Sequence, residues 1–303
     1  MAVESLLLQA LQEDAATTAL LAQYDGQGAI FYQMAPPDTD QGWDRIQYPR
    51  VDFTLDWTYS PERQADGACQ INVWCLNNGT TAPPEDVGEA VRECLRDLFL
   101  TDGDGEVYAL EWQRTDAFEA GGQEGEPLTI GVTLTFDILA FPVQITMEPD
   151  PVAGLLDYIK ARMPHALMVG LDQLPKLCRP TEEQPILYVR LSGDGSAMRN
   201  SWAVAWMDAT LPVHIFAPGA NLRQILSRTL CNAMALDGEC KLRDGSPMLI
   251  RRIALSASAN PLRQGQLTVT GRYGVLWKPP ETPKLNQAHM KGEFRFDKNE
   301  EFR

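Results

Sequence analysis

Hydrophobic and polar residues follow one another in a repeated order along this 303-residue chain. Several segments alternate apolar and polar side chains, which predicts strands with one covered face, and others repeat near 3.6 residues, which predicts amphipathic helices. In the first half these patterns predict a helix over 6–21, strands over 29–34, 48–57 and 69–75, a helix over 83–98, and a hairpin of strands 107–118 and 128–140.

The second half carries the same order of signals. Its patterns predict a helix over 155–167, strands over 174–177, 185–191 and 211–217, a helix over 219–233, and a hairpin of strands 248–259 and 266–277. A repeated order of elements indicates a duplication more strongly than any short motif does. We therefore predict two similar domains, residues 1–148 and 149–278, joined near two prolines, Pro149 and Pro151, which cannot donate a sheet hydrogen bond.

Each half thus has the order α-β-β-β-α-β-β. This order predicts an α+β fold, in which each domain is an antiparallel sheet with two helices packed on it. Residues 279–303 follow as a proline-rich tail, in which Glu293–Asp297 alternates as a strand does. We interpret the tail as an extended C-terminal arm that adds a strand to a neighbouring subunit's sheet. Terminal disorder is the alternative.

The net charge of −15 is shared unevenly between the halves. Residues 1–149 hold 26 acidic side chains against six arginines and no lysine, whereas the remainder holds 15 acidic against 20 basic side chains. A half this acidic repels phosphate backbones and anionic membranes, so it does not suit a nucleic-acid clamp. It suits a passage that DNA crosses without sticking, or a basic partner, and a solubilising surface is an equal alternative.

Cysteine spacing gives no support to a metal or redox site. The six cysteines form no CxxC pair and none lies at metal-ligand spacing with a histidine, so we expect no metal and no cofactor. Cys69, Cys75 and Cys94 share apolar faces with their neighbours, which favours buried free thiols in a reducing compartment. The chain begins without the basic region of a signal peptide. It has no apolar run near the roughly 20 residues of a membrane helix, so we expect no membrane partner.

Neither glycine-rich cluster of the chain predicts a phosphate loop. Residues 102–106 and 192–196 both contain an Asp-Gly pair, which favours a hairpin turn. The histidines His165, His214 and His289 lie far apart in the sequence. We expect His214 to lie on a sheet surface with its hydrogen bonds satisfied. We therefore expect no catalytic residue and no enzyme activity.

Seven tryptophans fall largely in strands and loops. Trp74 lies opposite the apolar side of its strand, so it either covers a second layer or contacts another chain. Strands with apolar residues on both faces favour subunit packing in a ring over an isolated monomer. The candidate interface residues are Trp43, Trp57, Trp74, Trp112, Phe294 and Phe296.

The order of elements resembles that of the tail terminator (tail completion, or neck) proteins of tailed bacteriophages. The residues that carry the resemblance are the opening helix Leu6–Ala10, the strand entry Tyr48–Val51, the strand Cys69–Cys75 before Pro83-Pro84-Glu85, and the hairpin Val107–Ala140. Such proteins form rings, usually of six subunits, that cap the tail tube and join it to the head, and they perform no chemistry. The family is typically a single domain of about half this length. A tandem pair therefore implies a hexameric, thickened ring or a trimeric, pseudo-sixfold ring.

The resemblance implies a structural protein of the virion at the head–tail junction, assembled in the host cytoplasm. Its implied partners are further copies of itself, the tail tube and sheath, the neck connector, and DNA only in transit through the lumen. The acidic residues expected to line that lumen are Asp102, Asp104, Glu106, Glu124 and Glu126. Two alternatives stay open. One is another virion component, such as a head–tail adaptor, tube or decoration protein, and the other is a hydrolase that uses carboxylates of the acidic half.

Overall fold

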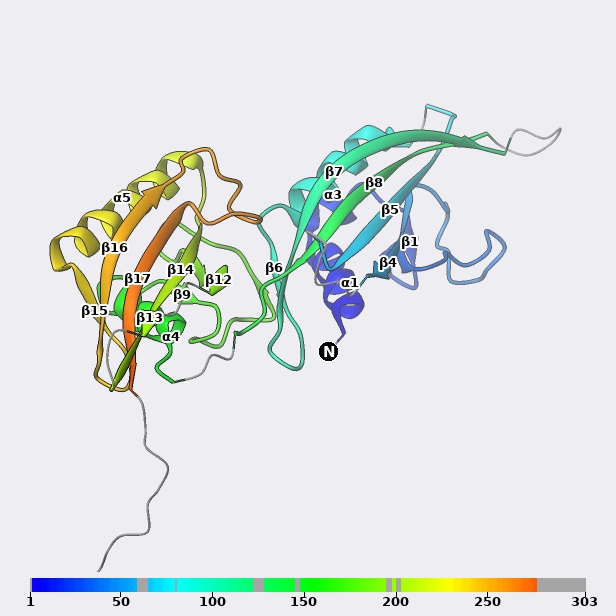
Figure 1. The fold of residues 1–303 in the computed structure, drawn as a ribbon. Helices are drawn as coiled ribbons and strands as arrows, with labels where there is room; N and C mark the ends of the chain where they lie inside the picture. The colour runs from blue at the N-terminus through cyan, green and yellow to red at the C-terminus, as the bar shows by residue number, and fades with distance from the viewer. Residues whose placement is uncertain are drawn as a thin grey trace, which may run out of the picture.

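The structure, a computed structural model, describes residues 2–58, 65–79, 81–121, 128–144, 148–194, 198–199 and 203–276. The described chain is α+β and forms two curled sheets with few helices, as predicted at this level. Figure 1 shows the two sheets side by side, and we call the part from α1 to β8 the first lobe and the part from α4 to β17 the second lobe.

The described part of the first lobe contains three helices and eight strands. In chain order they are α1 (Val3–Glu13), α2 (Ala15–Thr18), β1 (Gln23–Tyr24), β2 (Gln27–Gly28), β3 (Ile30–Tyr32), β4 (Arg50–Trp57), β5 (Gly67–Leu76), α3 (Pro84–Leu95), β6 (Phe99–Thr101), β7 (Val107–Ala120) and β8 (Thr129–Ala140). Strands β6, β7, β8, β5, β4 and β3 are neighbours in that order, and β1 and β2 form a separate small sheet. Helix α3 begins with Pro84, whose missing N–H costs nothing in a first turn, and Glu85 and Asp86 there favour the helix dipole.

The second lobe contains two helices and nine strands among the described residues. In chain order they are α4 (Pro151–Arg162), β9 (Leu167–Met168), β10 (Leu177–Cys178), β11 (Ile186–Val189), β12 (Gly193–Asp194), β13 (Met198–Arg199), β14 (Val204–Phe216), α5 (Ala220–Asp237), β15 (Glu239–Lys241), β16 (Pro247–Leu255) and β17 (Leu267–Leu276). Strands β15, β16, β17, β14, β11 and β9 are neighbours in that order. Asp150 caps α4 by accepting hydrogen bonds from two N–H groups of its first turn.

The two main sheets share one order of strands and one pattern of directions. The pairs β3–β4 and β9–β11 are parallel, and the other pairs of neighbouring strands are antiparallel. Strands β7 and β16 each carry an irregularity at the same place, between Trp112 and Arg114 and between Ile250 and Arg252. At each of these bulges two residues face one on the neighbouring strand. The two lobes are therefore similar in topology down to the position of a bulge.

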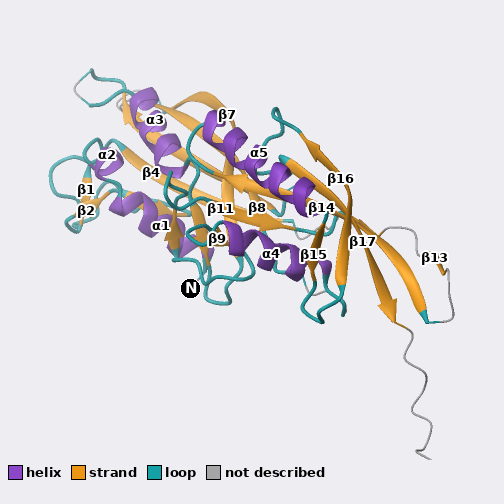
Figure 2. Cartoon of the chain, turned by 90° about the vertical axis from the view of Figure 1, so that its left-hand side faces the viewer, coloured by secondary structure: helices purple, strands orange, loops and turns teal. Residues whose placement is uncertain are grey.

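Each lobe has its own apolar core between its sheet and its helices. Figure 2 shows α1 and α3 in front of one sheet and α4 and α5 in front of the other. The largest side chains of the first core include Leu6, Leu11, Phe53, Ile71, Leu95 and Phe136. Those of the second core include Leu155, Ile159, Leu211, Val213, Leu230 and Met234. Burial of one such side chain stabilises the fold by about 1.5–3 kcal/mol.

The sheets are mixed, not purely antiparallel as the sequence predicted. Residues 33–49 and 169–185 carry the chain back to the end where the previous strand began, so β4 and β11 run parallel to β3 and β9. Alternation marks a segment as a strand but does not reveal the direction of its neighbour. A further short strand follows the last helix of each lobe, β6 after α3 and β15 after α5. Three residues are too few for alternation to reveal a strand.

One predicted strand lies in a different place. The prediction matched residues 174–177 to the strand over 29–34, but Leu167–Met168 holds that position beside β11. Leu177 instead pairs with Leu100 of β6, so β10 joins the sheet of the first lobe. Leu174 is buried in an apolar cluster between the lobes. The apolar residues of this segment therefore serve the junction and not the second sheet.

Candidate functional site

Aromatic side chains from both lobes form the junction between them. Phe99 and Phe141 of the first lobe pack against Phe216 of β14, with ring centroids 4.8 and 5.4 Å from it. Tyr188 of β11 lies 5.4 Å from the Phe141 ring and donates a hydrogen bond to the carbonyl of Pro142. Burial raises the pKa of Tyr188 to about 12, so its hydroxyl is a donor at neutral pH. The junction is thus a small apolar core of its own.

An ion-pair cluster holds the same two lobes together at the edge of this core. Arg263, in the loop between β16 and β17, donates hydrogen bonds to Glu111 of β7 and to Asp137 of β8. The three side chains are 22%, 16% and 28% exposed. Burial acts against the charge of Arg263, but hydrogen bonds to Asp137 and Glu111 raise its pKa. The two carboxylates therefore converge on one cation.

His214 lies buried at the junction, and the predicted surface position is wrong. Only 2% of the residue is exposed. Its Nδ1 lies 2.8 Å from the carbonyl oxygen of Pro261 and donates to it, while Nε2 has no partner among the described residues. Burial, assisted by the positive charge of Arg190, lowers the pKa of His214 to about 4. The sequence correctly predicted that His214 points away from the core of its own sheet. It did not show that the first lobe covers this face of β14.

The helix-free face of the first sheet is polar and partly exposed. Asp52 accepts hydrogen bonds from Trp74 Nε1 and, at 2.8 Å, from Asn72 Nδ2. Thr133 in turn donates to Asn72 at 2.8 Å, which links β4, β5 and β8 in one row. Trp74 is half-buried and faces away from the core, as its position in the strand predicted. Its polar atom is satisfied within the chain.

Gly131 makes room for the Phe118 ring on this face. A Cβ at residue 131 would meet the Val73 carbonyl oxygen at 2.2 Å and the Phe118 ring at 2.3 Å. Without that Cβ, the Phe118 ring lies edge-on to Trp74 with centroids 4.7 Å apart. The pair covers the end of the sheet near the tip of the β7–β8 hairpin.

Two candidate interface tryptophans pack inside the first lobe. Trp43 is only 7% exposed, packs against Tyr24 and Phe31, and donates a hydrogen bond to the carbonyl of Pro37. Because it has almost no free surface, the prediction that Trp43 contacts another chain is corrected here. Trp57 is half-buried and lies edge-on to Tyr108. Period-two patterns identify the face of a strand, but they do not show whether a loop covers it.

Trp112 is the most exposed tryptophan among the described residues, at 42%. It lies at the bulge of β7, and the Arg92 guanidinium sits over its ring at 5.0 Å. Its exposure is compatible with the predicted contact to another chain. Phe294 and Phe296 lie outside the described residues.

The acidic residues expected at a lumen fall in two places. Asp102, Asp104 and Glu106 form the turn between β6 and β7, where the Asp102 carboxylate accepts hydrogen bonds from the N–H groups of the other two, both at 2.9 Å. This is the hairpin turn that the Asp-Gly pair predicted. Glu124 and Glu126 lie outside the described residues.

Each lobe leaves part of one edge strand unpaired. Strand β6 covers β7 only as far as Ala109, and β15 with Gly238 covers β16 only as far as Ile250. Beyond these points no described strand pairs with the outer edges of β7 and β16. The free part of β7 carries Arg114, Asp116 and Glu119, and that of β16 carries Arg251 and Arg252, all exposed. The two free edges therefore differ in charge.

The sequence contains a signal for these edges that the alternation analysis missed. Arg114 follows Gln113, and Arg252 follows Arg251, so each predicted strand has two polar residues in succession at the bulge. Such a break in alternation marks a β-bulge, a device common at sheet edges.

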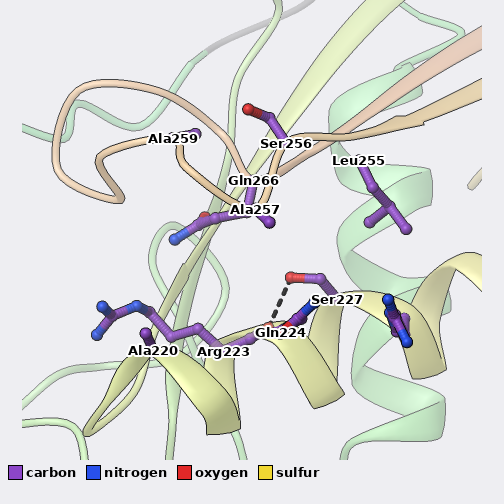
Figure 3. A pocket seen from close by; sticks show the side chains of 10 residues that line it. Ala220, Arg223, Gln224, Ser227, Leu255, Ser256, Ala257, Ala259 and Gln266 are labelled. Carbon is purple, nitrogen blue, oxygen red and sulfur yellow. Dashed lines mark hydrogen bonds between the residues drawn. The ribbon is translucent and has the colours of Figure 1, made fainter.

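A groove opens in the second lobe between α5 and the loop after β16 (Figure 3). Its cavity volume is about 140 Å³. In Figure 3, Ala257 and Ala259 of the loop face Arg223 and Ser227 of α5 across the groove. The sequence did not predict this groove, because it depends on how α5 lies on the sheet.

The titratable groups of the described residues show shifted pKa values but no cluster that could bind a metal ion. The carboxyl groups with a shifted pKa, namely Asp40, Asp208, Asp237 and Asp244, accept hydrogen bonds that lower the pKa. Burial raises the pKa of Cys75, Cys94 and Cys240 to about 11, and all six cysteines are free. Within the described ranges no group of three His, Cys, Asp or Glu side chains could hold a metal ion. The helices described are too short or too polar to cross a membrane.

The chain was compared with protein families, curated proteins and solved structures. No family model, no curated protein and no solved structure matches this chain.

Proposed function

We propose that this chain is a structural subunit of a tailed-phage particle, which assembles into a ring at the head–tail junction, ends the tail tube and links it to the neck. We propose also that its two lobes arose by duplication. The shared strand order, the shared parallel pair and the shared bulge of the two sheets support the duplication. The resemblance of the predicted elements to tail terminator proteins supports the choice of particle.

The observation that carries the ring is the pair of free strand edges. Unpaired edge strands bind a further strand through main-chain hydrogen bonds. The exposed Asp116 and Glu119 of β7 suit the exposed Arg251 and Arg252 of β16, so one copy can meet the next head to tail. A head-to-tail contact closes into a ring when its rotation divides a full turn. Three or six copies satisfy this, as a pseudo-sixfold ring of lobes or as a thickened hexamer.

The charge difference between the lobes assigns their partners within this proposal. The acidic first lobe, with Asp102, Asp104 and Glu106 at a turn, lines the DNA passage or faces the connector. Like charges keep DNA from sticking during transit. The second lobe, with the C-terminal arm, faces the tail tube and the sheath.

The experiment is a charge reversal at the edges. Arg251→Glu with Arg252→Glu should reduce ring formation at least tenfold in negative-stain images, and Asp116→Arg with Glu119→Arg in the same chain should restore it. The matched control reverses Lys176 and Lys241, which are exposed on the second lobe outside the free edge. Unchanged rings in the Arg251/Arg252 variant would contradict the edge contact. Long filaments from the wild-type chain would favour a tube protein over a terminator.

A further inference from the structure

The groove in the second lobe exists because α5 lies on its sheet differently from α3. Helix α5 has 18 residues and α3 has 12. Helix α3 packs on β5 and β8, whereas α5 packs on β14 and β16. Only Ser227, Leu230 and Met234 of α5 are fully buried. The first turns of α5 therefore stand over the edge of the core and form one wall of the groove.

The polar groups on the floor of the groove are already satisfied within the chain. Buried Gln266 accepts a hydrogen bond from the Ile215 N–H at 2.8 Å and donates one to the Ile215 carbonyl at 3.0 Å. Ser227 donates to the Arg223 carbonyl at 2.7 Å. The rest of the lining consists of Leu255, which is 45% exposed, three alanines, the polar residues Gln224 and Ser256, and two arginines. Leu255 and the alanines therefore offer apolar contact, and the buried polar groups of Gln266 and Ser227 need no ligand.

Two guanidinium groups flank this apolar cavity. Arg223 donates a hydrogen bond from Nη1 to the Ala217 carbonyl at 2.9 Å. A guanidinium has five N–H donors, so others remain for a ligand. Arg228, one turn further along α5, is exposed and makes no hydrogen bond or ion pair with the described part of the chain. A ligand that fits would therefore place an apolar group in the cavity and an adjacent carboxylate on these arginines.

We propose that residues 293–303 of this chain occupy the groove, with a phenylalanine ring in the cavity and a neighbouring carboxylate on Arg223 or Arg228. The segment places a phenylalanine next to a carboxylate twice, in Glu293-Phe294-Arg295-Phe296-Asp297 and in Glu300-Glu301-Phe302. An apolar cavity of about 150 Å³ is large enough for a benzene ring, and the groove encloses about 140 Å³.

The length of the chain allows this contact. Strand β17 begins at Leu267, next to the groove residue Gln266, and ends at Leu276, about 33 Å away at the rise of a strand. Residues 277–292 span up to about 50 Å when extended. The segment therefore reaches the groove of its own chain or of an adjacent copy. The contact does not depend on the proposed ring.

The test is a photo-crosslink in the full-length chain. Benzoylphenylalanine replaces Ala257, on the loop side of the groove, and crosslinked peptides are mapped by mass spectrometry after irradiation. We expect the dominant crosslink to fall within residues 293–303. The same probe at Ala235, exposed on α5 but not among the groove residues, should not yield it. Crosslinks only to other segments, or only to unrelated proteins, would overturn the assignment.

Variants then test the two chemistries separately. Replacing Phe294, Phe296 and Phe302 together by alanine alters neither lobe, and it should reduce the crosslink at least tenfold. Arg223→Glu with Arg228→Glu should reduce it at least fivefold, with the thermal unfolding of the chain as the folding control. A yield that stays unchanged in the phenylalanine variant contradicts the proposal, even if the arginine variant fails to fold.

Discussion

The two lobes share their topology, and they differ most at the side chains that point away from their cores. Val73 pairs with Val132 and Val213 pairs with Leu267, all four buried. The next outward residue is Trp74 in the first lobe and His214 in the second. Trp74 is held by a carboxylate on a partly exposed face, and His214 is buried against the other lobe. Inward positions maintain the common fold, and outward positions distinguish the two surfaces.

A second matched position shows how the two cores fill the same space differently. Phe136 lies opposite Cys69 at the bulge of the first sheet, and Gly271 lies opposite Ala209 at the bulge of the second. A Cβ at Gly271 would come within 2.4 Å of the Met248 sulfur. The methionine therefore fills the space in the second lobe that the phenyl ring fills in the first.

The largest effect is expected from substitutions at the matched positions Phe136 and Gly271. Phe136→Ala should lower the free energy of unfolding by about 3–5 kcal/mol, because it opens a cavity in the first core. Gly271→Ala should cost about 1–3 kcal/mol, because it crowds a flexible methionine. Urea denaturation of both variants measures the two costs. The match between the positions is contradicted if the glycine variant is the more damaged of the two.

A pH series separates the two outward residues. Well above pH 6.5, His214 is neutral in the folded and the unfolded chain, so it does not affect stability. As the pH falls from 6.5 to about 4, the unfolded chain gains a proton that the buried ring does not take up. This should remove about 3 kcal/mol of stability by pH 4. His214→Gln should lack that part of the acid dependence. If the two proteins lose stability in parallel from pH 7 to pH 4, the buried neutral histidine is ruled out.

Removal of the ion-pair cluster tests how strongly the lobes are joined. Arg263→Ala leaves Glu111 and Asp137 facing each other without a cation, and we expect a loss of about 2 kcal/mol. Calorimetry should then show two separated transitions in place of a coupled one. Adding Glu111→Gln and Asp137→Asn to the variant should recover part of the loss. One unchanged transition would mean that the aromatic cluster alone couples the lobes.

The smallest effect is expected at an exposed ion pair within the second lobe. Arg243 donates to Asp157 at 2.8 Å, with side chains 55% and 42% exposed. Arg243→Ala should change the free energy of unfolding by less than about 1 kcal/mol, because such pairs are screened by water. A larger loss in the same urea assay would show that this pair, unlike other surface pairs, helps to hold α4 in place.

The sequence was sufficient for those features that depend on local periodicity. The alternation of 69–75, the helix after Pro84 and the long hairpin of the first lobe are all confirmed as elements. The direction of β3, the strand β10 across the junction and the burial of His214 depend on contacts far apart in the chain. The groove beside α5 depends on how a helix lies on its sheet. Periodicity contains none of this information, because it describes one segment at a time.

The mass of the purified protein in solution tests the proposed ring most directly. One chain has a mass of 33.7 kDa. Light scattering on the purified protein should give about 100 or 200 kDa, the mass of three or six chains, and negative-stain images of the same fraction should show closed rings. A mass near that of one chain at every concentration, with no closed particles in the images, would contradict the account.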